Sequence, residues 1–300
     1  MQTSTTAAHC RNRKESDLMK KMFAMILALL MILSCFAACG AKAPAADAPK
    51  TDAPAADAPK DDAPAAESDL AAVINSGTLV VGITDYAPMD YKDNNGEWTG
   101  FDAEFSRLFA EELGVECEFF VIADWSKKFL ELDTNQIDCV WNGMTIDETA
   151  LANASVSDPY VVNAQVLVMK ADVVANYADA ASIVDLSVAV ENGSAGQTAA
   201  EAAGVKNIVL VQDQAAALME VGAGTSDACV IDITMANAMT GEGTNYADLT
   251  YGLALTSEEY GVAFRKESDI TAKFNEFLAA KLADGTLQAL ADKYQLTLVG

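Results

Sequence analysis

The stretch "TLVVGITDYAPMDYKDNNGEWTGFDAEFSRLFAEELG", residues 78–114, decides the fold of this 300-residue chain. Its opening "TLVVGIT" is an apolar run that predicts a buried strand. Its closing segment places Phe101, Phe105, Leu108 and Leu113 on one helical face and ends at Gly114, which predicts an amphipathic helix. A strand followed by a helix is the repeating unit of α/β proteins.

The same alternation continues along the chain. We expect strands at 115–123, 137–143, 163–170, 187–193, 207–211, 227–232 and 260–266, and helices at 124–135, 195–204, 213–224, 269–285 and 286–296. This order predicts two α/β units with mostly parallel sheets. Ligands bind beyond the carboxyl ends of such strands. The segments that leave those ends carry hydroxyls, amides, aromatic rings or carboxylates; they are "TDYAPMDY", "ADWSK", "WNGMT", "ENGSAG" and "VIDIT".

The first part of the chain is not expected to belong to the fold. Residues 1–38 are interpreted as a leader and signal peptide, because the apolar run Met22–Ala38 follows Lys20 and Lys21. The sequence "FAAC" predicts lipidation of Cys39; a plain cleaved signal peptide and a retained anchor helix are the alternatives. Residues 39–69 repeat Ala, Pro and Asp without aromatic side chains, which predicts a disordered tether.

Several classes of chemistry are disfavoured by composition. The only histidine, His9, lies in the predicted leader, so we expect no histidine-dependent nucleophile, no histidine-ligated metal and no cofactor. Beyond Cys39, the cysteines Cys117, Cys139 and Cys229 are far apart in apolar runs and are expected to be buried free thiols. A net charge of −25 would repel nucleic acid.

Ordered motifs then identify a family resemblance over residues 79–294. They are the opening stretch, "WNGMTI" followed by "SDPY", "AVENGSAG", "SDACVID", and "YGVAFRKES" leading to "LADGTLQALADKY". The sequence resembles the extracellular solute-binding lipoproteins of ABC importers, polar amino-acid type, solute-binding protein family 3. The resemblance implies the type II periplasmic-binding fold, in which two Rossmann-like α/β lobes are joined by a two-strand hinge.

Domain bounds and partners follow from this resemblance. The first lobe would comprise residues 70–164 plus 258–300, and the second lobe residues 165–257. The lobes would close on a small amino acid or a similar polar solute and deliver it to a membrane permease. The protein would be a monomer, anchored by lipid outside the cytoplasm, and would not be an enzyme.

The resemblance also assigns a ligand site. Tyr86 and Trp125 would flank the ligand's side chain, and Asp232 would pair with its ammonium group. The main-chain and side-chain groups of Asn142, Gly143, Met144 and Thr145 would hydrogen-bond its α-carboxylate or α-amine. The helix start at Ser194, Ala195 and Gly196 suits a carboxylate. Ordinary structural roles are the alternatives: a turn for Tyr86, a core aromatic for Trp125, a strand-to-loop turn for residues 142–145, wall or core for Met144, and helix capping for Ser194 and Asp232.

One position departs from the family pattern. Relatives carry an arginine five residues after Thr145, where its guanidinium clamps the α-carboxylate, but this chain has Ala150. Three explanations remain open. Lys128 could replace the arginine, the helix start at residues 194–196 could hold the carboxylate with the amides of residues 143–145, or the ligand could lack an α-carboxylate.

Two other functional classes are considered. An extracytoplasmic dehydratase acting on cyclic acids could share this fold, with Glu191 or Asp232 as the acid, although Ala150 and the missing histidine argue against it. A surface solute sensor or adhesin is the other alternative.

Overall fold

The computed structural model describes residues 68–300. The predicted leader, Cys39 and the tether up to residue 67 lie outside the described residues. The elements are α2 (Asp69–Ser76), β1 (Thr78–Ile83), β2 (Tyr91–Lys92), β3 (Trp98–Thr99), α3 (Phe101–Leu113), β4 (Glu116–Val121), η1 (Trp125–Lys127), α4 (Lys128–Asp133), β5 (Cys139–Thr145), α5 (Glu148–Asn153), β6 (Ser155–Val156), β7 (Val161–Asn163), β8 (Gln165–Lys170), η2 (Val174–Asn176), η3 (Ala180–Ile183), β9 (Ser187–Glu191), α6 (Ala195–Ala202), β10 (Asn207–Val211), α7 (Gln214–Ala223), β11 (Ala228–Asp232), α8 (Ile233–Met239), β12 (Leu249–Ala254), β13 (Glu258–Phe264), α9 (Ile270–Ala283) and α10 (Thr286–Tyr294).

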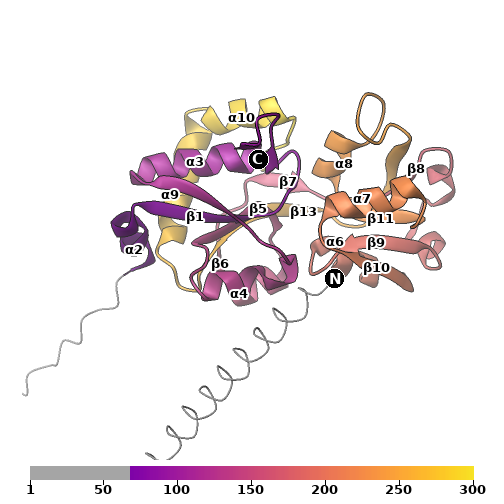
Figure 1. Cartoon of the computed structure of the whole chain (residues 1–300), viewed down its shortest axis with the longest axis horizontal. Coiled ribbons are helices and arrows are strands. Elements are labelled where there is room, and N and C mark those ends of the chain that lie inside the picture. The colour runs from indigo at the N-terminus through magenta and orange to yellow at the C-terminus, as the bar shows by residue number, and fades with distance from the viewer. Residues whose placement is uncertain (1–67) are drawn as a thin grey trace, which may run out of the picture. The chain divides into compact units, whose positions relative to one another are not determined.

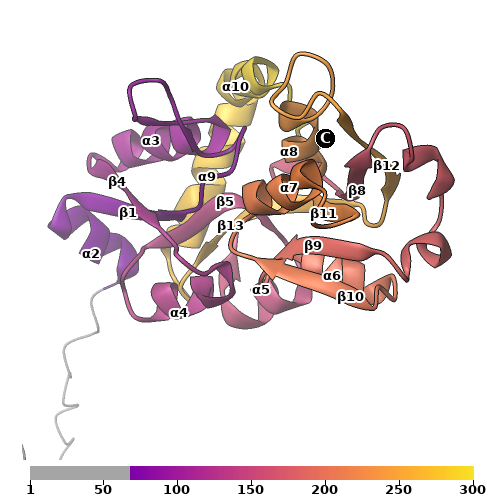
Figure 2. The same ribbon diagram turned by 45° about the vertical axis from the view of Figure 1, so that its right-hand side comes forward.

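The first lobe is built on a six-stranded sheet in the order β4-β1-β5-β13-β6, with β7 also paired to β13. Strand β1 is parallel to β4 and β5, whereas β13 is antiparallel to β5. Helices α3, α9 and α10 pack on one face of this sheet and α4 and α5 on the other (Figures 1 and 2). We use "first lobe" for this sheet, these helices and the segments between them, which include β2, β3 and η1.

The second lobe is built on a five-stranded sheet in the order β10-β9-β11-β8-β12. Strand β9 is parallel to β10 and β11, and β8 is antiparallel to β11 and β12. Figure 2 shows α7 and α8 over one face of the sheet and α6 over the other. We use "second lobe" for this sheet and these helices.

The chain crosses between the two sheets twice, from β7 to β8 and from β12 to β13. After the second crossing, α9 and α10 return to α3 in the first lobe. The predicted architecture of two α/β lobes joined by two crossing segments is therefore confirmed. The exact residue bounds of the lobes remain a prediction.

The sequence did not predict every element. The helix α2 begins at Asp69, where the tether was expected to extend, and Ser68 caps it by accepting the N–H of Ala71. The strands β8 and β13, each of which follows a crossing, run antiparallel to their neighbours and make both sheets mixed. The helix expected at 124–135 is a single turn of 3₁₀ helix followed by the shorter α4.

Aromatic packing holds the first lobe. Phe105, Phe109, Phe274 and Phe277 interlock with Trp141 from β5, with ring centroids 4.9–6.3 Å apart. Edge-to-face geometry adds favourable contacts beyond the buried apolar area. This cluster fixes β5, and the C-terminal end of β5 reaches the space between the lobes.

Candidate functional site

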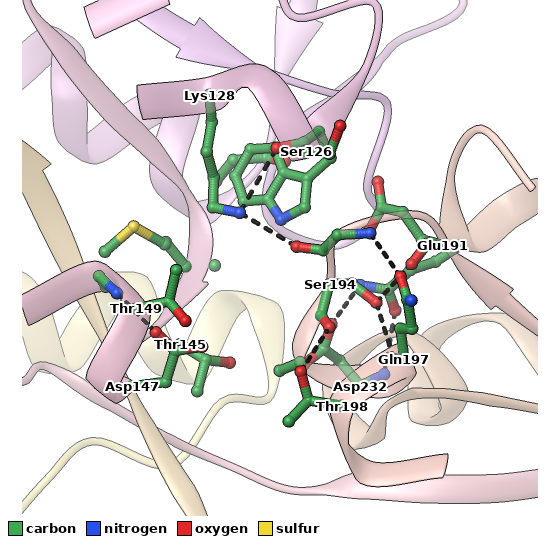
Figure 3. A pocket seen from close by; sticks show the side chains of 18 of the residues that line it. Ser126, Lys128, Thr145, Asp147, Thr149, Glu191, Ser194, Gln197, Thr198 and Asp232 are labelled. Atoms are coloured by element: carbon green, nitrogen blue, oxygen red, sulfur yellow. Dashed lines mark hydrogen bonds between the residues drawn. The ribbon is translucent and has the colours of Figure 1, made fainter. Parts of the chain in front are cut away.

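A cavity of about 270 Å³ lies between the lobes. It has the size of a site for a small molecule. Ten of the predicted site residues line it: Tyr86, Trp125, Lys128, Asn142, Gly143, Met144, Thr145, Ser194, Ala195 and Asp232. Figure 3 shows the labelled first-lobe residues Thr145, Asp147 and Thr149 on one side and Glu191, Ser194 and Asp232 on the other.

Gly196 is the predicted site residue that does not line the cavity. It is buried in α6, and a Cβ there would lie 2.8 Å from the carbonyl oxygen of Val230. The glycine is therefore needed for close packing of α6 on β11. Its predicted ligand contact is not supported by this placement.

Most polar groups of "WNGMT", residues 141–145, form hydrogen bonds with other groups of the protein. Strand β5 continues through Thr145, so these residues do not form a turn. The Asn142 side chain donates to Asp90 Oδ2 at 2.7 Å and accepts from Thr84 Oγ1 at 2.6 Å. The Gly143 N–H donates to Asp102 Oδ2 at 2.6 Å. The predicted hydrogen bonds from the Asn142 side chain and the Gly143 amide to a ligand are therefore not supported, because both groups already have buried partners.

Tyr86 and Trp125 are buried walls of the cavity. The Tyr86 ring packs directly on Gly143, where a Cβ would lie 2.6 Å from Tyr86 Cε1. Its hydroxyl bonds to Tyr260 and to Thr234 at 2.5 Å each. Trp125 carries the ammonium of Lys128 over its ring, 4.8 Å from the centroid. Lys128 therefore occupies one face of the Trp125 ring, and the role of both rings in flanking a ligand remains a prediction.

Lys128 is the one cation among the described residues that line the cavity. Its Nζ donates to the carbonyl of Gly193 at 3.1 Å and to that of Trp125 at 3.4 Å. Burial lowers the pKa of Lys128 to about 8. An ammonium has three donors, so these bonds leave one for a carboxylate in the cavity. Arg107 and Arg265 do not line it.

Helix α6 begins at the cavity. Ser194 caps it by accepting the N–H of Gln197 at 3.2 Å, and the Gly193 N–H donates to the Gln197 side chain at 2.8 Å. The capping interpretation of Ser194 is therefore correct, and Ala195 provides the first amide of the helix. Helix N-termini favour anions.

Asp232 ends β11 and is held by side-chain amides. Its Oδ1 accepts from Asn163 and, at 2.7 Å, from Gln165, and its Oδ2 accepts from Gln214. Asn163 and Gln165 also donate to Glu258 Oε1, which accepts the Thr145 hydroxyl at 2.8 Å. The carboxylate of Asp232 is thus linked to that of Glu258, which begins β13, through two amides of the β7–β8 crossing. Burial, and then the charge of Glu258, raise the pKa of Asp232 to about 6.

Further lining residues were not predicted as ligand contacts; they include Ser126, Asp147, Thr149, Glu191, Gln197 and Gln214. Glu191 is the most unusual of them. It ends β9, is 4% exposed, and its Oε1 has no hydrogen-bond partner. The sequence could have indicated Glu191 as a site residue, because "SVAVE" is a strand that ends in an acidic residue, as "ACVID" does.

The cavity is acidic. Among the described residues that line it, Lys128 is positively charged and four carboxylates are acidic: Asp147, Glu191, Glu201 and Asp232. Within residues 68–300 no cluster of His, Cys, Asp and Glu could hold a metal ion, and Cys117, Cys139 and Cys229 are free. Over the same residues, no helix has the length and apolar character needed to cross a membrane.

Direct contacts join the lobes beside the cavity. They include the bond from Lys128 to Gly193, a bond of 3.3 Å from Asn192 to Asp124, and the bond between the hydroxyls of Tyr86 and Thr234. The structure is therefore a closed arrangement of the lobes, and opening the cavity would break these bonds.

Residues 79–297 match the bacterial extracellular solute-binding proteins, family 3. The chain is 30% identical over 232 residues to the L-cystine-binding protein TcyJ of Escherichia coli (strain K12), covering 76% of this chain and 86% of the relative. It is 27% identical over 281 residues to the ABC transporter glutamine-binding protein GlnH of Bacillus subtilis (strain 168), covering 92% and 97%.

A solved structure shows the same architecture. The ancestral amino acid-binding protein AncCDT-1, a precursor of cyclohexadienyl dehydratase, has a TM-score of 0.69 and 32% identity to this chain. The similarity covers 76% of this chain and 99% of that protein.

Proposed function

Because the chain belongs to the bacterial extracellular solute-binding proteins, family 3, we propose that it is the receptor component of an ABC import system. It captures an amino acid or a similar small polar solute in the cavity between its lobes and delivers it to a membrane permease. The relatives TcyJ and GlnH, by their names, bind amino acids, and GlnH belongs to an ABC transporter.

The observation that carries this proposal is the position of the cavity. It is lined by residues from both lobes, and the same lobes are joined by bonds that only the closed arrangement can make. A ligand held there adds its own contacts to both lobes and shifts the population toward the closed form. A permease can then distinguish the loaded receptor from the empty one by its shape.

The geometry supports a role for each of three groups. Asp232 receives the α-ammonium of the ligand, since its carboxylate is buried and fixed in place by neutral amides. The α-carboxylate lies against the amide of Ala195 and the remaining donor of Lys128. This combines two of the three explanations for the missing arginine at Ala150.

A thermal-shift screen of amino acids and polyamines tests the function, because a ligand that binds only the folded state raises the melting temperature. We expect at least one amino acid to give a clear shift that Asp232→Asn abolishes. Asp185→Asn, which removes an exposed carboxylate of the second lobe, is the matched control. If no amino acid or polyamine shifts the wild-type protein, the receptor proposal is wrong.

The same proposal covers attachment to the membrane. Cys39 would carry a lipid, and residues 40–67 would connect it to the described lobes. Cys39→Ala should move the protein from the membrane fraction into the medium. Unchanged membrane association would favour the retained anchor helix instead.

We propose that the protein catalyses no reaction of its own. The dehydratase alternative keeps one favourable observation, because the buried Glu191 has a pKa raised to about 8 and could donate a proton at neutral pH. Incubation with prephenate, followed by absorbance of the aromatic product, tests this. Turnover that Glu191→Gln abolishes would replace the receptor proposal.

A further inference from the structure

Two carboxylates enter the cavity from the second lobe. Glu191 is the last residue of β9 and Asp232 the last residue of β11. These strands are parallel neighbours, so their ends meet at the same edge of the sheet. Figure 3 shows both residues on the second-lobe side of the cavity.

Glu191 differs from the other lining carboxylates in having a buried oxygen without a hydrogen-bond partner. Asp147 Oδ1 accepts the N–H of Ala150 at 2.7 Å, and Glu201 Oε1 accepts from Gln197 at 2.8 Å. Both oxygens of Asp232 accept side-chain amides. Glu191 is 4% exposed and its Oε1 has no partner. Buried carboxylates are unfavourable unless a cation, a donor or a proton compensates the charge.

The groups that face Glu191 provide only part of this compensation. Asp232 from β11 and Asp213, which caps α7, add negative charge, and a side-chain hydrogen bond from Gln214 favours the ionised form. Lys128 of α4 is the cation nearby, but its Nζ donates to the carbonyls of Gly193 and Trp125. Burial and the two aspartates raise the pKa of Glu191 to about 8, so a proton occupies it at neutral pH.

We propose that Glu191 is a specificity-determining residue that binds a cationic group on the ligand's side chain, so that the receptor selects amino acids with a basic side chain. This rests on the proposed function. The acidic cavity agrees with it, because a ligand with two positive groups and one carboxylate offsets the excess negative charge. Asp232 then takes the α-ammonium, and Glu191 exchanges its proton for the side-chain cation.

Arginine and citrulline test the proposal by calorimetric titration, since they have nearly the same shape and differ in side-chain charge. For the wild-type protein at pH 8 we expect arginine to bind at least about tenfold more tightly, because charge-assisted hydrogen bonds are the strong ones. In Glu191→Gln the ratio should fall to within about threefold, with citrulline affinity retained. Asp185→Asn, which removes an exposed carboxylate of the second lobe that does not line the cavity, should keep the wild-type ratio.

The pH dependence gives a second readout. Between pH 7 and pH 8 the ionised fraction of a group with a pKa of about 8 rises about fivefold. The arginine-to-citrulline ratio should rise by the same factor in the wild-type protein and stay flat in Glu191→Gln. Titration of Lys128 or Asp232 cancels from the ratio, because both ligands share the α-amino and α-carboxyl groups.

Three results would overturn the inference: equal binding of arginine and citrulline by the wild-type protein, a ratio that survives Glu191→Gln, or an equal loss of the ratio in Asp185→Asn. In each case amino-acid binding itself persists and the receptor proposal stands. If no amino acid binds at all, the proposed function fails and this inference fails with it.

Discussion

Gly193 lies where the two lobes touch, and its replacement should block closure. Its φ is +76°, and a Cβ at this position would lie 2.6 Å from Cα and Cβ of Ser126 in the first lobe. Ordinary contacts of a Cβ begin at 3.4 Å, so the lobes of Gly193→Ala must stay roughly 1 Å farther apart.

The expected loss of affinity follows from the bond that this displacement breaks. Lys128 donates to the carbonyl of Gly193 across the lobes. Hydrogen bonds to charged groups contribute about 1.5–3 kcal/mol, which corresponds to roughly a 10- to 100-fold weaker Kd. Titration calorimetry with the ligand from the thermal-shift screen measures the loss, and small-angle X-ray scattering should show less compaction when ligand is added.

Gly204→Ala is the matched control. Gly204 lies in the second lobe with φ +81°, and its Cβ would meet only Val184 Cγ1 at 3.7 Å. Both substitutions place an L-residue in the left-handed region, at a cost of about 1–2 kcal/mol, and should lower Tm by about 2–8 °C. Only Gly193→Ala should lose affinity. Affinities within threefold of each other in the two variants would refute the closure argument.

Three further outcomes are expected. Burial raises the pKa of Asp102 from 3.8 to about 7, so its contribution to stability is complete below pH 4 and is lost as the pH rises through 7. In thermal melts, the Tm of the ligand-free protein should therefore fall between pH 5 and pH 8. The Tm of Asp102→Asn should fall less steeply over the same range. Lys128→Met removes the bond to Gly193 across the lobes for every ligand, so agmatine, which lacks the carboxylate, should also bind more weakly. Arginine should lose about tenfold more affinity than agmatine, and equal losses in calorimetry would remove Lys128 as the carboxylate partner. Arg265→Met leaves Asp69 and Asp138 without their shared cation at a site where the arginine is 13% exposed, and should lower the free energy of unfolding in urea by about 2 kcal/mol. The control Lys206→Met breaks an exposed ion pair with Asp185 and should lower it by less than about 0.5 kcal/mol. Equal losses in the two variants would contradict the argument.

The fold could be predicted largely from hydrophobic periodicity. The runs that became β1, β9, β10 and β11 are short, apolar and bounded by turn residues, and the helices between them are amphipathic. The antiparallel placement of β13 beside β5 could not be read in this way, because strand pairing depends on where the chain crosses between lobes. Short elements such as α5 have too few residues to show a period.

The candidate site was predicted in position but not in detail. The segments after the strands do converge on one cavity, as strand ends must in such sheets. The use of the Gly143 amide by Asp102 depends on helix α3 packing against β5, a contact between residues far apart in sequence. The unpaired oxygen of Glu191 likewise depends on the packing of β9, β11 and α7 around it. Sequence patterns report which residues are polar, not which of them already have partners.

The uneven distribution of aromatic residues makes this protein its own optical reporter. Its tryptophans, Trp98, Trp125 and Trp141, all belong to the first lobe, and residues 165–257 contain neither tryptophan nor phenylalanine. Trp141 lies in the core and Trp125 on the cavity wall. A change in indole emission on adding ligand can therefore be assigned to Trp125 by a single Trp125→Phe control. Melting of the second lobe alone would leave the indole emission unchanged except through Trp125 and would be visible mainly in the far ultraviolet.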